Sequence, residues 1–311
     1  MNLKKPGGYV RSACLVVAVA LALLSALTPA QGQAEFSDWS LPVNLGPPIN
    51  TPGTEVGPYI SKNGLSLYHL RNFDVFVSLR ATVDAPWGMR QSLGAAINTT
   101  FNEASPSLSP DEHVLLFASA HPGGFGDFDL YVSRRHNRRD DLGWQPPLNL
   151  GDGVNTAASE LQPNLFEDDA TGVITVYFTS NRPDGLGGDD IYASTLLPDE
   201  TFGPAVLVAE LSTPFNDSSA SIRRDGLEMI LTSDRPGTLG GLDLWVSTRA
   251  TTADPWSEPI NLGPVVNTAG MDAGSALSFR GTELYFSSNR PGGLGSRDLY
   301  RTTRSKLDGT D

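Results

Sequence analysis

The chain has 311 residues, of which 39% are apolar, and it contains 32 Gly and 23 Pro. This length is sufficient to bury a core, and the turn-forming composition favours a β protein over a helical one. The formal net charge of −13 argues against nucleic acid or an anionic membrane surface as a partner. Cations, basic proteins and neutral glycans remain open as ligand classes.

The N-terminus has the pattern of a secretory signal peptide. Basic residues precede the apolar run Ala13–Leu27, and a stretch of small and polar residues follows it. We therefore expect a signal peptide over residues 1–34, cleaved after Ala34 or, alternatively, after Ala30. An uncleaved membrane anchor is the other interpretation, although the run is short for a span.

The expected mature chain, residues 35–311, forms one domain and acts in the periplasm or outside the cell. The single cysteine, Cys14, lies in the signal peptide, so the mature chain has no disulfides and depends on core burial for stability. Removing residues 1–34 takes the formal net charge from −13 to −16, because three basic residues and no acidic ones are lost.

The rest of the chain repeats with a period of about 55 residues. Each repeat contains an alternating strand that begins at an aspartate, as in "DLYVSRR" and "DLWVSTR". An apolar strand such as "ELYFSSN" precedes it, a pattern such as "WSEPINLG" follows, and a further short strand begins the repeat. The five aspartates are Asp74, Asp129, Asp190, Asp243 and Asp298.

Repeats of this length with four short strands predict a five-bladed β-propeller, an all-β fold with four-stranded blades. The chain begins with a fourth-strand pattern, Trp39–Gly46, that has no blade before it. It ends with a blade, Met271–Arg304, that has no fourth strand after it. We therefore expect the N-terminal strand to close the ring, which leaves no open sheet edge.

The phrase between the second and third strands, "SSNRPGGLGSRDLY" in the last repeat, predicts a tight turn. Pro291 fixes one corner, and Gly292 or Gly293 supplies the positive φ of the next. The following aspartate is expected to accept backbone N–H bonds from the loop. Three arginines recur in this phrase and are expected to pair with a nearby carboxylate: Arg182, Arg235 and Arg290.

The pattern "LYFSSNRPGGLGSRDLYRTTR", together with "PSLSPD" at Pro106–Asp111, resembles the WD40-like propeller repeat of the TolB type. The resemblance covers Trp39 to Arg304. It implies a propeller fold and a protein-binding role in the bacterial cell envelope. Blade one departs from the pattern because it lacks the Gly-rich loop, and blade two carries His121 where other repeats have Arg.

An acidic residue recurs at the start of the first strand of every repeat. First strands line the channel of a propeller, so these carboxylates are candidates for an acidic ring at one channel mouth. Such a ring is consistent with a Ca²⁺ site, with a rim that faces a partner, or with structural pairs to the recurring arginines. The five residues are Glu55, Glu103, Glu160, Asp217 and Asp272.

Two further features are candidate sites. The stretch Asp184–Asp190, "DGLGGDD", loosely resembles a calcium loop but lacks its regular order. A basic cluster in the longest loop stands out in an acidic chain, and it is either a solvated loop or a contact with a specific partner. Its arginines are Arg134, Arg135, Arg138 and Arg139.

Familiar enzyme motifs are absent, including the nucleophile elbow, the zinc-protease helix and the phosphate loop. We therefore expect a non-enzymatic, monomeric binding platform that contacts an envelope protein or a glycan and needs no cofactor. The alternative is a glycoside hydrolase or lyase that uses two channel-mouth carboxylates as acid and base. Near-identical sequence around these acids argues against that alternative, because a catalytic pair needs unlike environments.

Overall fold

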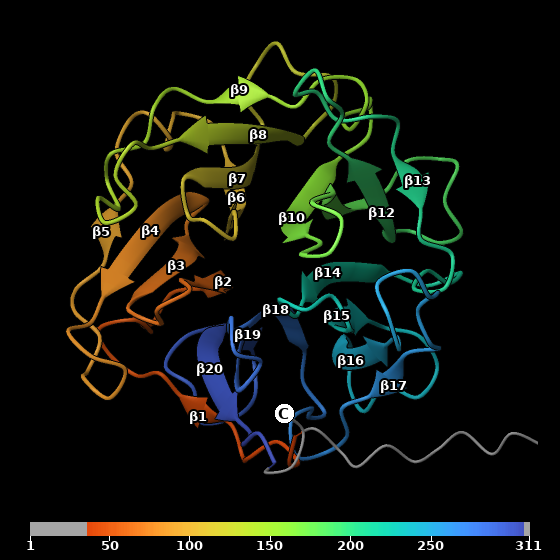
Figure 1. Ribbon diagram of the computed structural model, residues 1–311. Helices are drawn as coiled ribbons and strands as arrows, with labels where there is room; N and C mark the ends of the chain where they lie inside the picture. The colour runs from red at the N-terminus through yellow and green to blue at the C-terminus, as the bar shows by residue number, and fades with distance from the viewer. Residues whose placement is uncertain (1–35, 308–311) are drawn as a thin grey trace, which may run out of the picture.

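The computed structural model describes residues 36–307, which form a ring of five four-stranded antiparallel sheets (Figure 1). The predicted five-bladed β-propeller is confirmed. The predicted signal peptide lies outside the described residues. Within the described range, no helix is long and apolar enough to cross a membrane.

Each blade contributes one strand to the inner wall of the ring and places its other strands successively outward (Figure 1). The inner strands are β2 (Glu55–Ile60), β6 (Glu103–Leu108), β10 (Glu160–Glu167), β14 (Asp217–Ile222) and β18 (Asp272–Leu277). The second strands are β3 (Ser66–Arg71), β7 (Val114–Ser119), β11 (Ile174–Ser180), β15 (Glu228–Ser233) and β19 (Glu283–Ser288).

The third strands are β4 (Asp74–Leu79), β8 (Asp129–Arg134), β12 (Asp190–Thr195), β16 (Asp243–Thr248) and β20 (Asp298–Thr303). The outer strands are short: β5 (Gln91–Ser92), β9 (Leu148–Asn149), β13 (Val206–Leu207), β17 (Ile260–Asn261) and β1 (Val43–Asn44). Blades 1 to 4 take their strands in chain order, and blade 5 consists of β18, β19, β20 and β1.

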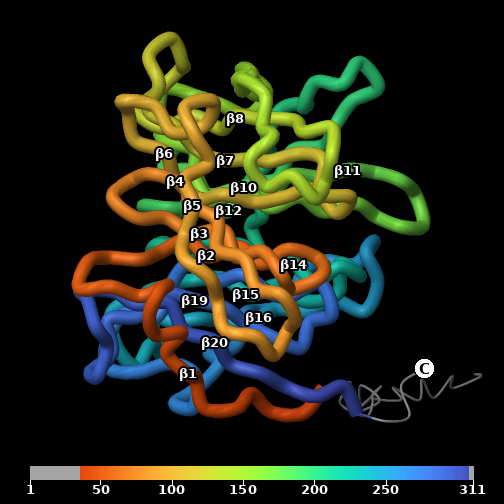
Figure 2. Tube along the Cα trace, turned by 90° about the vertical axis from the view of Figure 1, so that its left-hand side faces the viewer, coloured from red at the N-terminus to blue at the C-terminus, as the bar shows by residue number. Residues whose placement is uncertain are grey.

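The N-terminal strand closes the ring as predicted. β1 pairs with β20 in antiparallel register, with Val43 opposite Arg301 and Asn44 opposite Tyr300. The edge-on view shows β1 in red beside β20 in blue (Figure 2). Closure by two distant segments ties the chain ends together and leaves only two-residue strands at the rim, which protects the sheets from edge-to-edge pairing.

Large apolar side chains of the second and third strands fill the space between neighbouring sheets. Phe117, Phe178 and Phe286 occupy the same register in three blades and are each at most 1% exposed. Alternation along each strand sends these residues to the faces between blades. The second strand β15 is buried along its whole length, so the sheets pack closely on both sides.

An arginine that follows the third strand stacks on a tryptophan at the outer edge of four blades. The guanidinium carbon of Arg304 lies 4.4 Å from the ring centroid of Trp39, which joins the last blade to the N-terminal segment. This cation–π contact repeats the one made within single blades, so the closing strand is held like the others. The pairs are Arg80–Trp87, Arg135–Trp144, Arg249–Trp256 and Arg304–Trp39.

Neighbouring blades are joined by one recurring backbone hydrogen bond. The N–H of each inner-strand acid donates to the carbonyl of the residue just before the third-strand aspartate of the previous blade. Across the closing junction, Glu55 N–H donates to the Arg297 carbonyl at 3.0 Å. The other donor–acceptor pairs are Glu103–Phe73, Glu160–Phe128, Asp217–Asp189 and Asp272–Leu242.

The Gly-rich phrase makes the turn predicted for it and also allows blades to approach. Gly292 has φ of +92°, and Asp298 accepts the N–H groups of Leu294 and Gly295. A Cβ on Gly295 would lie 1.9 Å from the carbonyl oxygen of Gly53 in the neighbouring blade. Gly126, Gly187 and Gly240 have the same close approach, so this glycine serves blade packing rather than a special φ.

Candidate binding site

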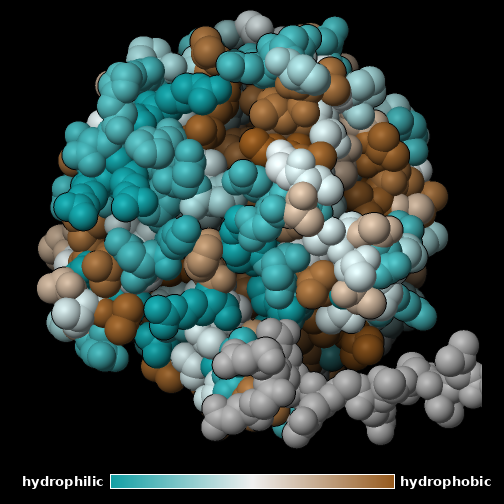
Figure 3. All heavy atoms as spheres, viewed as in Figure 1, coloured by the Kyte–Doolittle hydropathy of each residue, from teal (hydrophilic) through white to brown (hydrophobic). Residues whose placement is uncertain are grey.

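The central channel opens on the face where the inner strands begin, in a cavity of about 250 Å³. All five inner strands contribute to its wall, mostly through small and neutral polar side chains. The channel is therefore a polar cavity within a ring whose core is apolar. Figure 3 shows the opposite face, where the inner strands end; it is hydrophilic over its left side and centre, and hydrophobic groups gather toward the upper right.

A β-bulge in each inner strand shapes this wall. The pairing register shifts at the third residue of every inner strand, and that residue has a positive φ. Such a residue interrupts the ladder and re-aims the side chains around it. Three of the five are not glycine, so blades 2, 3 and 4 hold side chains at a backbone conformation that favours glycine. The residues are Gly57, Ser105, Gln162, Ser219 and Gly274.

Several hydroxyl groups of the channel wall have no hydrogen-bond partner within the described protein. These are the buried side-chain oxygens of Ser107, Ser219 and Ser275, which come from three different blades. Gln162 is engaged instead, because its Oε1 accepts from Thr179 Oγ1 at 2.8 Å and from Ser219 N–H at 3.0 Å. These oxygens are buried as placed, so each hydroxyl would meet a polar ligand in the channel once its side chain rotates toward the cavity.

Two charged residues line the same cavity, Asp189 and Arg297. Burial raises the pKa of the Asp189 carboxyl above its usual value, and the nearby carboxylates of Asp190 and Asp234 raise it further. Both neighbours are engaged, since Asp190 accepts loop N–H groups and Asp234 accepts from Asn216. Asp189 is the one carboxylate in the cavity wall among the described residues.

The opposite end of the channel is narrower and more highly charged. Its cavity has a volume of about 50 Å³, and Tyr59 and Asn164 line both cavities. Glu112 accepts the backbone N–H of Lys62 at 2.6 Å, which ties blade 2 to blade 1 at this mouth. The larger and more neutral cavity at the other mouth is the better candidate for ligand binding.

The five inner-strand acids do not form the expected open ring. Each is buried with 0% of its surface exposed, and none of them lines the channel cavity. In every blade the carboxylate accepts the N–H and the Oγ–H of a threonine four residues earlier, as Glu103 does from Thr99 at 3.1 and 2.7 Å. The expectation of a carboxylate rim that contacts a partner is thus corrected, because hydrogen bonding within each blade turns these groups away from the channel.

Three of these acids also pair with the recurring arginines, as expected. Arg235 lies 2.5 Å from Asp217 and Arg290 lies 2.6 Å from Asp272. Arg182 lies 3.2 Å from Glu160, and Arg71, from the end of β3, lies 3.2 Å from Glu55. Glu103 of blade 2 has no such cation among the described ion pairs.

Sequence reasoning missed the threonine that holds each acid. The chain repeats an Asn-Thr-x-x-x-acid pattern, as in "NTPGTE" and "NTAASE", and Ser212 replaces the Asn in the copy that ends at Asp217 of blade 4. The Asn or Ser bonds the backbone of the third strand, and the Thr caps the acid. The fixed spacing of four between hydroxyl and carboxylate was the available signal. The threonines are Thr51, Thr99, Thr156, Thr213 and Thr268.

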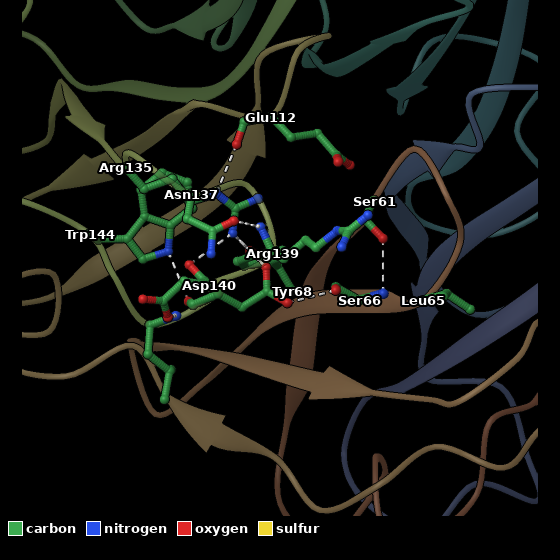
Figure 4. A network of polar contacts seen from close by, with 12 residues as sticks. Ser61, Leu65, Ser66, Tyr68, Glu112, Arg135, Asn137, Arg139, Asp140 and Trp144 are labelled. Carbon is green, nitrogen blue, oxygen red and sulfur yellow. Dashed lines mark hydrogen bonds and ion pairs between the residues drawn. The ribbon is translucent and has the colours of Figure 1, made fainter.

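The basic cluster divides into one structural arginine and three exposed ones. Arg135 is 3% exposed and donates to the Glu112 carbonyl, to Tyr68 Oη and to Asp141 Oδ1, the last at 2.6 Å (Figure 4). It also stacks on Trp144. Arg135 is therefore corrected from a partner contact to a link between blades 1 and 2. The remaining arginines, Arg134, Arg138 and Arg139, are exposed.

The loop at Asp184–Asp190 serves its own turn. Asp190 accepts the N–H groups of Leu186 and Gly187, and Asp184 accepts from Tyr192 Oη at 3.1 Å. Within residues 36–307, no group of three or more His, Cys, Asp or Glu side chains is placed to hold a metal ion.

No protein-family model matches the chain, and no curated protein matches it by sequence. Solved structures do match. The α-L-arabinofuranosidase from Lactobacillus brevis is 15% identical with a TM-score of 0.60, covering 85% of this chain and 93% of its own. The catalytic domain of the Coprinopsis cinerea GH62 α-L-arabinofuranosidase is 13% identical with a TM-score of 0.53, covering 88% and 98%. Identities this low establish the shared fold alone.

Two further solved structures also match the chain. The xylan β-1,4-xylosidase from Bacillus halodurans is 16% identical with a TM-score of 0.57, covering 85% of this chain and 55% of its own. The putative TolB from Agrobacterium tumefaciens is 15% identical with a TM-score of 0.47, covering 82% and 79%. The chain is thus a five-bladed propeller, and its resemblance to the TolB-type repeat stays a prediction from the sequence.

Proposed function

We propose that the protein is a non-enzymatic binding protein, acting outside the cytoplasm, whose channel takes a neutral, hydroxyl-rich ligand such as a glycan segment. The observation that carries this proposal is the channel wall, where hydroxyls of Ser107, Ser219 and Ser275 have no hydrogen-bond partner among residues 36–307. Ligand hydroxyls both donate and accept, so they match such groups without the cost of burying a charge.

Burial of the inner-strand acids supports binding over catalysis. A glycosidase needs two carboxylates that flank the scissile bond with separated pKa values. The five sequence candidates are saturated by threonine and serine hydroxyls, backbone N–H groups and arginines, away from the cavity. Asp189 is left as a single acid in the described wall, without a carboxylate partner there.

A glycoside hydrolase is the second candidate, and the structural comparisons favour it. Three of the four neighbours described above are named as arabinofuranosidases or a xylosidase. Among the described residues of the channel wall, Asp189 fits a catalytic role, because its raised pKa suits a general acid. On this interpretation the second carboxylate would have to enter the channel from outside the described wall.

Ligand binding and hydrolysis are separated by one set of measurements. The purified protein is titrated calorimetrically with neutral xylo- and arabino-oligosaccharides, and the same mixtures are examined for released sugars. We expect saturable binding without product, and about tenfold weaker binding by the double variant Ser107→Ala/Ser275→Ala. That variant should fold normally, since neither hydroxyl makes a hydrogen bond within the part of the chain that the structure describes.

Two results count against the proposal. Product release that Asp189→Asn abolishes would establish the hydrolase in its place. Binding that is unchanged in the double serine variant would move the ligand site out of the channel. Retained sugar binding by Asp189→Asn, without product from either protein, supports the binding role.

A further inference from the structure

An arginine side chain fills the same position in blades 3, 4 and 5. In blade 5, Arg290 donates to Asp272 Oδ1 at 2.6 Å, to the Val266 carbonyl at 2.7 Å and to Ser288 Oγ at 2.9 Å. Carboxylate, carbonyl and hydroxyl together satisfy a guanidinium that is almost fully buried. Arg182 and Arg235 make the corresponding contacts in blades 3 and 4.

An aromatic pair completes this arginine position. The guanidinium of Arg290 lies 5.0 and 4.7 Å from the ring centroids of Phe286 and Tyr300, which are 6.1 Å apart. Blade 2 keeps the same pair, Phe117 and Tyr131, also 6.1 Å apart. The spacing of the rings is therefore the same whether or not the blade carries the arginine.

Blade 2 lacks the cation. His121 stands at the arginine position but is exposed, with Nδ1 2.8 Å from the Pro122 carbonyl and its ring against Phe101. Glu103 nevertheless stays fully buried, and no arginine, lysine or histidine pairs with it among the described ion pairs. A buried carboxylate without a cation is costly, so this blade gains most from a cation supplied by another molecule.

A cavity of about 360 Å³ lies where the arginine would be. Its wall contains the blade 2 counterparts of the residues that supply the carbonyl, the hydroxyl and the two rings around Arg290, together with Thr99, His121 and two prolines of the outer edge, but Glu103 is not part of it. We call this cavity the blade 2 socket. The residues that correspond to the Arg290 site are Ile97, Phe117, Ser119 and Tyr131, with Glu103 behind Thr99 and Ser119.

We propose that the blade 2 socket binds the guanidinium of an arginine side chain presented by a partner protein. A planar guanidinium stacks on aromatic faces and reaches carboxylate and carbonyl together, which an ammonium group does less well. The chain's strong negative charge favours a basic partner. Phe101 and Phe125, which are 41% and 49% exposed on adjoining loops, offer apolar contact to the residues beside that arginine.

This site is distinct from the channel, because the socket and the channel cavity share no lining residue. The test of the socket is therefore independent of the test of the proposed function. Binding is measured by calorimetry and by chemical-shift perturbation with N-acetyl-L-argininamide, with the uncharged citrulline analogue as the ligand control. A short peptide with an arginine between two phenylalanines is the third probe.

We expect one saturable site for the arginine probe, no binding of the citrulline probe, and tighter binding of the peptide. His121→Arg should abolish binding, because an arginine from the chain itself then fills the socket as in blades 3 to 5. Glu103→Gln should weaken binding about tenfold, since it removes the charge-assisted bond. Arg290→Ala is the matched control: it opens the equivalent position in blade 5 and should add a second site.

Equal binding by wild type and His121→Arg would overturn the proposal, as would the absence of saturable binding to wild type. If the peptide binds more weakly than N-acetyl-L-argininamide, the claim that a partner protein presents the guanidinium is wrong. A failure of Arg290→Ala to fold leaves the test intact. His121→Arg adds a satisfied ion pair and should raise the unfolding temperature, so it remains a folded comparison.

Discussion

His69 is the best place to test the energetics of the ring by pH. It is fully buried in the second strand of blade 1, where Nε2 lies 3.3 Å from Ser78 Oγ and Nδ1 has no hydrogen-bond partner among the described residues. Burial, together with the charge of Arg90, lowers the pKa of His69 from 6.5 to about 4. Blades 2, 3 and 5 carry phenylalanine at this register, so His69→Phe restores the side chain that the fold uses elsewhere.

The magnitude follows from proton linkage. Because the folded-state pKa is the lower one, the unfolded chain takes up the proton first as the pH falls. The stability that His69 contributes by staying neutral is fully present above about pH 6.5 and is lost progressively as the pH falls to about 4. Between about pH 7.5 and pH 5, His69 alone should reduce the free energy of unfolding by about 2 kcal/mol.

The assay is urea unfolding, followed by tryptophan fluorescence, of wild type and His69→Phe at both pH values. Acidification from pH 7.5 to pH 5 should lower the free energy of unfolding of wild type by about 2 kcal/mol more than that of His69→Phe. Any packing cost of the larger ring, or of leaving Ser78 without its partner, cancels in this comparison. Parallel pH profiles of wild type and His69→Phe would refute the reasoning.

The remaining predictions concern blade contacts. Gly295→Ala should destabilise the fold by about 3 kcal/mol or more in the same urea assay, because its Cβ would meet a backbone oxygen of blade 1. Gly241→Ala is the control and should be near neutral, because its Cβ would meet no described atom within 4 Å. Arg135→Ala should lower the free energy of unfolding by about 3–5 kcal/mol, because it leaves the carboxylate partner of Arg135 without a cation. Arg139→Ala, at an exposed position, should change it by no more than about 0.5 kcal/mol. Equal effects of the two variants would contradict this division of the basic cluster. Deletion of residues 36–46 should expose the edge of β20 and cause self-association, measured by light scattering after size-exclusion chromatography; a monomer as stable as wild type would contradict the closure argument.

Local pattern was sufficient for most of the fold. The repeat of about 55 residues, the four strand patterns within it and the orphan Trp39–Gly46 predicted the number of blades and the way the ring closes. These features are visible in the sequence because each blade solves the same packing problem and so keeps the same strand periodicity and turn residues. The turn role of Gly292 and the loop contacts of Asp298 were predictable for the same reason.

The candidate site needed the tertiary structure. Alignment of the repeats placed the five acids at the channel, but it did not show the direction of their side chains. That direction depends on the threonine four residues earlier and on an arginine about 20 residues later, which meet only in the folded blade. The bulge at the third position of each inner strand, which forms the channel wall, has no sequence signal where the residue is serine or glutamine.

The sequence by itself determined the architecture, because strand alternation, turn chemistry and repetition are properties of neighbouring residues. It also marked His121 as the departure from the arginine phrase. Only the tertiary structure showed that this departure leaves a buried carboxylate, an aromatic pair and a cavity together in blade 2, since those groups come from four separate segments. Burial and the pairing of charges are decided by residues far apart in the chain, and for that reason they appeared only once the ring was closed.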